Sequence, residues 1–168
     1  DWAAPRIADE RMRAIFSRMA ARSGIEHRWS VLPPAPGGGS LIAPGGFYGD
    51  PDLPPTSARM AAYADHAPDL AMQAIAALGD ALVPASITHI VVASCTGFVA
   101  PGIDQIIARR LGLSPSVERV LIGFMGCYAG VTALRTARHI VRSEPDAVVL
   151  VVSVELSTLH LSLADKPE

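Results

Sequence analysis

The sequence is poor in cysteine, aromatic residues and charge, and it has no long apolar run. Two of its 168 residues are cysteine, 5% are aromatic and 18% are charged. Two cysteines cannot supply the disulfide framework of a small secreted domain. No CxxC, HExxH or carboxylate cluster offers ligands at metal-binding spacing. No apolar run reaches the roughly 18 residues that span a bilayer. We therefore expect free thiols, no metal site and no membrane segment.

The charge pattern argues against another class of function. The formal net charge is −2, and residues of both signs are spread along the chain without a basic stripe. Binding to nucleic acid is therefore not expected. The first residues also lack the basic segment and following apolar stretch of a signal peptide, so we expect a reducing, cytoplasmic location.

Half of the residues are hydrophobic, and the mean hydropathy is +0.32. This composition fits either a deeply buried α/β sheet or a piece whose partner surface is missing. Strand and helix patterns alternate along the chain, which predicts βαβ crossovers and a mainly parallel sheet. The expected helices span residues 6–22, 57–78 (capped by Ser57), 102–111 and 127–142, the expected strands span 27–32, 87–94, 117–124 and 147–155, and residues 33–56 form a Pro/Gly-rich loop.

Three of the predicted strands run into small or polar residues. Cys95 follows the first of them, Cys127 follows the second, and Ser157 and His160 follow the third. The carboxyl ends of parallel strands meet at one edge of a sheet, and function collects there. We therefore expect the candidate site at this edge.

Cys127 is the strongest candidate among these residues. It lies between a strand and a helix, with Gly126 and Gly130 beside it, and small neighbours allow a tight turn and the approach of a substrate. A thiol in the first turn of a helix faces unpaired N–H groups and the positive end of the helix dipole, which favour the reactive thiolate. Cys127 is therefore either a nucleophile or a small buried cysteine that packs like a hydrophobe.

A series of short motifs surrounds Cys127. They are Cys95-Thr96-Gly97, Pro101-Gly102-Ile103-Asp104, Leu111-Gly112-Leu113, Val117-Glu118-Arg119-Val120, Gly126-Cys127-Tyr128-Ala129-Gly130 and Leu150-Val151-Val152-Ser153-Val154-Glu155. In order and spacing they resemble the chalcone-synthase-like family of type III polyketide synthases. The resemblance is strong over residues 86–160, weaker over 6–32 and poor over 33–57.

The resemblance implies a thiolase-like fold, which consists of two similar halves. Residues 1–168 would form the first half, an α/β unit with a mixed, mainly parallel five-stranded sheet and helices on both faces. The family uses a Cys-His-Asn catalytic set. Cys127 matches the cysteine, whereas the histidine and asparagine belong to the second half, which is absent from this chain.

The resemblance also implies residues that line the substrate cavity. Cys95, Ala100 and Ser157 match such positions, although Cys95 reads equally well as a core thiol. His160 is the one histidine that follows a strand at the reactive edge, so it either lines the cavity or forms a hydrogen bond at a surface. The other histidines, His27, His66, His89 and His139, lie at strand starts, within a helix or far along the helix of Cys127.

Arg18 and Arg22 match basic positions that hold the phosphates of coenzyme A in the family. Two cations one helical turn apart can share a polyphosphate, but they also fit an ordinary charged helix end. The family has a third basic residue one turn earlier, where this chain has Ile15.

The activity implied by the resemblance is a decarboxylative condensation of malonyl-CoA onto an acyl-CoA starter held on Cys127, without metal or organic cofactor. A homodimer is implied as well, with the loop 96–101 reaching across. Small side chains at Ala100, Cys95 and Ser157 leave room for a long fatty acyl starter. One alternative is a β-ketoacyl-carrier-protein synthase III, whose cysteine motif typically reads Ala-Cys-Ala-Gly-Phe. The other is a noncatalytic truncated half.

Overall fold

The structure is a computed structural model that describes residues 7–27, 29–50 and 52–161. The chain divides into two compact units, one formed by Asp1–Val31 with Leu161–Glu168 and the other by Leu32–His160. Each unit is described by itself.

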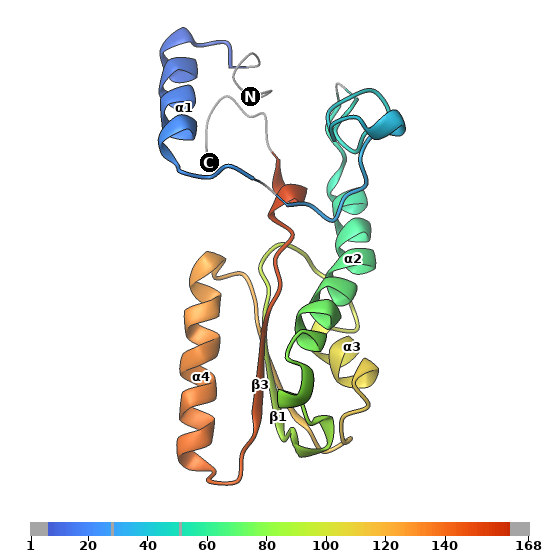
Figure 1. The fold of residues 1–168 in the computed structure, drawn as a ribbon, viewed down its shortest axis with the longest axis vertical. Coiled ribbons are helices and arrows are strands. Elements are labelled where there is room, and N and C mark those ends of the chain that lie inside the picture. The colour runs from blue at the N-terminus through green and yellow to red at the C-terminus, as the bar shows by residue number, and fades with distance from the viewer. Residues whose placement is uncertain (1–6, 28, 51, 162–168) are drawn as a thin grey trace. The chain divides into compact units, whose positions relative to one another are not determined.

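The smaller unit contains helix α1, Glu10–Arg22 (Figure 1). Its predicted start at residue 6 lies outside the described residues. The described helix begins later because the Asp9 carboxylate accepts the backbone N–H of Met12 at 2.8 Å and so caps the first turn. The strand expected at residues 27–32 is wrong, since none of its described residues pairs with a neighbouring strand. An extended segment needs such a partner for its backbone groups.

The larger unit begins with the Pro/Gly-rich segment, which is a loop with one short 3₁₀ turn, as predicted. Helix α2, Thr56–Ala76, follows it. Ser57 is not the cap, because the helix begins one residue earlier and Pro55, with an extended backbone, occupies the cap position. None of the described helices combines the length and apolar content that a membrane span requires.

Three parallel strands form the sheet: β1 (His89–Ala93), β2 (Glu118–Ile122) and β3 (Val149–Ser153), in the order β2-β1-β3. Helix α3 (Ile103–Arg110) connects β1 to β2, and α4 (Ala129–Ser143) connects β2 to β3. The strand and helix alternation was therefore predicted correctly. The described residues form three strands, where the resemblance implies five for a complete half.

The helices cover both faces of this sheet, as expected (Figure 1). Helix α4 packs on one face, and α2 and α3 pack on the other. The central strand β1 is buried along its whole length, whereas the edge strand β2 is mostly exposed. The core therefore lies around β1, and its carboxyl end is fixed from both sides.

Candidate active site

Cys127 lies in the tight turn that links β2 to α4. The turn passes through two residues with left-handed backbone conformation, Phe124 (φ 57°) and Gly126 (φ 67°). Glycine adopts this conformation without strain, whereas phenylalanine does so only under tertiary constraint. Residues Gly126–Tyr128 then form one 3₁₀ turn that leads into α4. The α-helix predicted to begin at Cys127 thus begins two residues later, and the Cys127 thiol is exposed at its start.

Cys95, at the carboxyl end of β1, holds this turn in place. Its sulfur accepts the backbone N–H of Met125 at 3.3 Å, and its thiol donates to the carbonyl of Gly126 at 3.5 Å. Both cysteines are free. Cys95 therefore contacts Gly126, the residue immediately before Cys127. Cys95 is half-buried and also packs against the core, which is consistent with either of its predicted environments.

Glu155, just beyond β3, connects the end of this strand to the loop that follows β1. One carboxylate oxygen accepts the backbone N–H of Cys95 at 2.8 Å, and the other accepts the Thr96 hydroxyl at 2.6 Å. The Thr96 oxygen in turn accepts the N–H of Leu156 at 2.8 Å. We did not single out Glu155 from the sequence. Its signal was an acidic side chain at the carboxyl end of a buried strand, the edge where polar groups converge.

A buried pair of hydroxyl groups, Tyr63 and Ser94, supports the loop after β1. The Tyr63 hydroxyl lies 2.6 Å from the Ser94 hydroxyl, and the Tyr63 ring lies against Gly97. A Cβ atom on Gly97 would come within 2.0 Å of the ring, so only glycine fits there. Burial raises the pKa of Tyr63 above its ordinary value, and the hydrogen bond to Ser94 opposes this shift. The tyrosine is therefore neutral over the physiological range.

The other predicted cavity residues lie on exposed segments. The His160 ring donates from Nε2 to the carbonyl of Thr96 at 2.7 Å, so it is a hydrogen-bonded histidine beside the loop that follows β1. Ser157 is exposed and shares a short 3₁₀ turn with His160. Ala100 is exposed in the loop before α3. The structure thus links His160 to the loop that follows Cys95.

Arg18 and Arg22 are exposed on α1, which belongs to the smaller unit and is described apart from Cys127. Their spacing places them one turn apart on one helix face. Arg11, seven residues before Arg18, lies on that face too. Arg11 does not match a basic position of the family, so the resemblance gave no signal for it.

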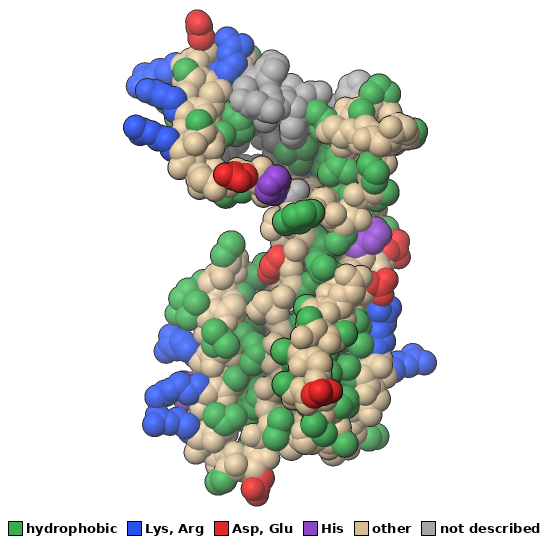
Figure 2. Space-filling view, viewed as in Figure 1, with side chains coloured by type: hydrophobic (Ala, Val, Ile, Leu, Met, Phe, Trp, Pro, Cys, Tyr) green, Lys and Arg blue, Asp and Glu red, His purple; other side chains and the backbone are tan. Residues whose placement is uncertain are grey.

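Large apolar side chains remain exposed near Cys127. The side chains of Phe98, Phe124, Met125 and Tyr128 are all at least about half exposed, and Phe124 reaches 78%. Further apolar residues are exposed along α4, where basic residues occupy the outer side (Figure 2). Exposed apolar residues that gather on one surface often mark an interaction site.

The turn, its thiol and the parallel sheet agree with a comparison against known families. The family described as "Chalcone and stilbene synthases, N-terminal domain" matches residues 7–164. The chain belongs to this family. The resemblance read from the motifs around Cys127 is confirmed, and so is its assignment to type III polyketide synthases with a thiolase-like fold.

Individual members of the chalcone and stilbene synthase family support the assignment. "Alpha-pyrone synthesis polyketide synthase-like Pks18" of Mycobacterium tuberculosis is 43% identical over 109 residues, covering 64% of this chain and 28% of that protein. Bisdemethoxycurcumin synthase of Oryza sativa subsp. japonica is 39% identical over 153 residues, covering 90% and 37%. The crystal structure of CsyB complexed with CoA-SH matches with a TM-score of 0.73 and 30% identity, covering 94% and 41%. The chain therefore spans well under half the length of these relatives.

Proposed function

We propose that this chain supplies the nucleophile-bearing half of a type III polyketide synthase, with Cys127 as the residue that carries the acyl chain. The observation that carries the proposal is the exposed Cys127 thiol on a glycine-containing turn, at the carboxyl edge of a parallel sheet and at the start of α4. The positive end of a helix stabilises negative charge, and a thiolate is the nucleophilic form of cysteine. Cys95 and Glu155 hold the turn in this position.

The proposed reaction has two steps at Cys127. The thiolate attacks the carbonyl of an acyl-CoA, so a new carbon–sulfur bond forms while the bond to coenzyme A breaks and its thiolate leaves. Malonyl-CoA then loses carbon dioxide, and the electron pair of the broken bond remains as an enolate. The enolate carbon attacks the acyl group on Cys127, which releases the Cys127 thiolate again. The family resemblance assigns stabilisation of the developing oxyanions to a histidine and an asparagine of the second half.

The remaining parts of the proposal concern binding. Arg18 and Arg22 on α1 would hold the phosphates of coenzyme A, in line with the coenzyme bound in the CsyB structure. The exposed apolar residues near Cys127 support a homodimer in which this half contributes to the interface. Two free thiols fit a reducing compartment such as the cytoplasm. The substrates, the dimer and the division of the whole protein into halves all rest on the family resemblance.

The decisive experiment maps the acylated residue. The parent enzyme for this test is a version that includes a second half; it is incubated with an acyl-CoA, and the adduct is located by peptide mass spectrometry. We expect the adduct on Cys127, its loss in Cys127→Ala and its persistence in Cys95→Ala. The reverse pattern would transfer the nucleophile role to Cys95. Asp146→Asn, on an exposed loop at the other edge of the sheet, serves as the matched control and should keep full acylation.

The second test concerns the chain alone. Without the histidine and asparagine, the 168-residue chain should acylate slowly but should not consume malonyl-CoA over multiple turnovers, because loss of one oxyanion donor alone costs roughly 3–4 kcal/mol of transition-state stabilisation. Sustained turnover by the chain alone would show that its own residues complete the site, and His160 would be the first to test.

A further inference from the structure

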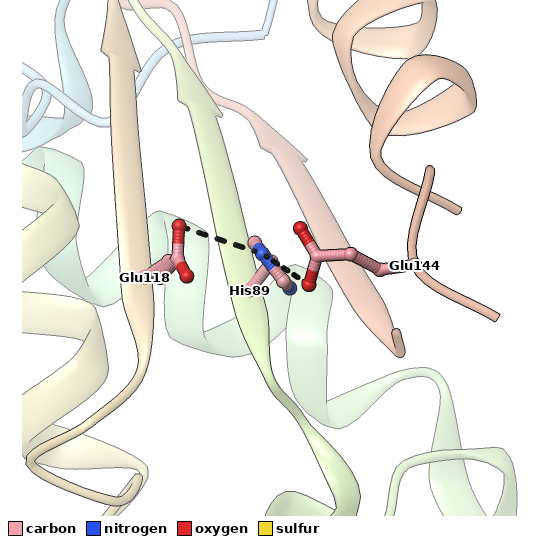
Figure 3. A group of neighbouring side chains, drawn as sticks. All are labelled: His89, Glu118 and Glu144. Carbon is pink, nitrogen blue, oxygen red and sulfur yellow. Dashed lines mark ion pairs between the residues drawn. The ribbon is translucent and has the colours of Figure 1, made fainter. Parts of the chain in front are cut away.

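Three side chains with metal-ligating atoms converge at the edge of the sheet opposite Cys127 (Figure 3). His89 begins β1, Glu118 begins β2 at the same register, and Glu144 follows the last residue of α4. His89 Nε2 lies 3.7 Å from a carboxylate oxygen of Glu118 and 3.6 Å from one of Glu144. One ligand atom from each residue lies within 4.8 Å of the other two. The arrangement thus gathers one imidazole and two carboxylates at one point.

The buried histidine distinguishes this group from an ordinary acidic surface. His89 is only 5% exposed, and its Nε2 points at both carboxylates. Among the described residues, these two oxygens are the groups that Nε2 faces, and both lie beyond normal hydrogen-bond length. A nearly buried ring thus directs one nitrogen at two carboxylates.

The other ring nitrogen fixes the orientation of the histidine. His89 Nδ1 lies 2.8 Å from the Thr88 hydroxyl oxygen. That hydroxyl oxygen also accepts the N–H of Val148 at 2.9 Å, so Thr88 is itself held in place by the neighbouring strand. A metal-binding histidine is oriented in the same way, by a hydrogen bond at the nitrogen that does not face the metal.

We propose that His89, Glu118 and Glu144 bind a divalent cation of the zinc type. Zinc takes neutral imidazole and carboxylate ligands, and three protein ligands leave a fourth tetrahedral position for water. Ligands about 2.1 Å from a tetrahedral zinc lie about 3.4 Å from one another, and the two measured Nε2–oxygen separations are close to this value. The cation would clamp the starts of β1 and β2 to the end of α4, far from the proposed chemistry at Cys127.

No metal site was expected from the sequence, because it has no ligands at the short, regular spacing of metal-binding motifs. These three residues are distant in the sequence and meet only through the parallel register of β1 with β2 and the return of the chain after α4.

The proposal is tested by titrating the full 168-residue chain, freed of metal, with zinc chloride in a calorimeter. We expect one zinc per chain. Glu118→Gln and Glu144→Gln should each weaken zinc binding about tenfold or more. Even substitution of a residue that only hydrogen-bonds to a metal ligand lowers metal affinity by that factor. Both side chains are largely exposed, so neither change should disturb folding, which circular dichroism checks. Asp146→Asn, an equal loss of charge two residues from Glu144, should bind zinc like the parent.

Cobalt distinguishes this site from the two free cysteines, which also bind soft metals. The cobalt-loaded chain should show ligand-field absorption without a thiolate charge-transfer band, and Cys127→Ser should leave the spectrum unchanged. The proposal fails if the chain binds no zinc, if both glutamine variants bind like the parent, or if the spectrum reports thiolate ligands. That failure would leave the role of Cys127 untouched.

Discussion

The two edges of the sheet differ in how their polar side chains find partners. At the carboxyl edge, loops that follow three strands are joined by short hydrogen bonds, and each carboxylate oxygen of Glu155 accepts a donor from the loop after β1. At the amino edge, His89 lies between Glu118 and Glu144, and its Nε2 has no donor or acceptor at hydrogen-bond length among the described residues. The Glu155 carboxylate therefore has its hydrogen-bond donors within the chain, whereas the group at the amino edge places His89 Nε2 between two carboxylates without a hydrogen bond to either.

This difference teaches where each edge is sensitive. Changes at the carboxyl edge should act through packing and internal hydrogen bonds and should be indifferent to added metal. The effect of changes at the amino edge should depend on the metal ions in the solution. The substitutions that follow concern the carboxyl edge.

The largest effect on stability is expected from Gly97→Ala. The new Cβ would lie within 2.0 Å of the Tyr63 ring, which is enclosed by the core and cannot move away freely. Overpacking of this kind costs about 1–3 kcal/mol or more. Urea denaturation of the 168-residue chain measures the loss.

Gly130→Ala is the matched control for that substitution. Its Cβ would meet only the Ser153 hydroxyl at 3.7 Å, an ordinary contact, and it lies within α4. Because alanine favours a helix over glycine, the variant should gain about 0.5–1 kcal/mol. Equal stabilities of the two variants would contradict the tight contact between Gly97 and Tyr63.

Removal of the Glu155 carboxylate should have the next largest effect. Glu155→Ala leaves the Cys95 N–H and the Thr96 hydroxyl without their acceptor, at a cost of about 1–2 kcal/mol. It should also slow acylation of Cys127, because Cys95 supports the turn that carries the nucleophile. Glu155→Gln keeps one acceptor oxygen and should restore part of both. An acylation rate unchanged in Glu155→Ala would show that the turn does not depend on this carboxylate.

Tyr63 should make stability depend on pH in the alkaline range. The pKa of Tyr63 is raised in the folded chain above its ordinary value of 10.0. The folded state therefore holds this proton more tightly than the unfolded state, so its stabilising contribution is present below pH 10 and is lost as the pH rises toward the folded pKa.

Tyr63→Phe tests this pH dependence directly. The variant should lose about 1 kcal/mol at neutral pH, because the Ser94 hydroxyl loses its partner. The difference between the two proteins should shrink as the pH rises above 10, because unfolded parent chains lose the Tyr63 proton there while the folded parent still holds it. Parallel stability curves for parent and variant across the alkaline range would contradict the assignment.

The smallest effect concerns the starter group. Exposed Ala100 is one of three small residues at positions that resemble the cavity wall, so Ala100→Met in the parent enzyme should reduce kcat/KM for palmitoyl-CoA more than for acetyl-CoA. Each methylene that no longer fits costs about 0.8 kcal/mol. Comparison of kcat/KM for acetyl-, coumaroyl-, octanoyl- and palmitoyl-CoA measures the preference. An unchanged ranking would remove the argument for a roomy cavity.

Local features of the sequence were sufficient to predict the turn that carries Cys127 and the alternation of strands and helices. Gly126 and Gly130 mark the turn around Cys127, and the apolar runs of β1 and β3 stand between helical patterns. Helix starts were less accurate, because caps such as Asp9 and Pro55 depend on single residues. The segment 27–32 has a strand-like pattern but no partner strand in the described residues, so the pattern alone misled.

Contacts between distant residues could not be predicted in this way. Glu155 and Cys95 are separated by 60 positions, and Tyr63 and Ser94 by 31. Such pairs follow from strand order and register, which periodicity does not encode. The group at His89 was missed for the same reason. The resemblance to a family placed Cys127 correctly in its turn but did not reveal what holds that turn.

The position of β1 in the sheet has a consequence for the synthesis of the protein. β1 is the central strand, yet it precedes both of its neighbours in the chain. On the ribosome, its apolar residues Ile90, Val91 and Val92 emerge before β2 and wait longer still for β3. Strand pairs that close late fold slowly and leave apolar surface open to aggregation. The segment that ends up most buried is therefore the one most in need of chaperones while the chain is being made.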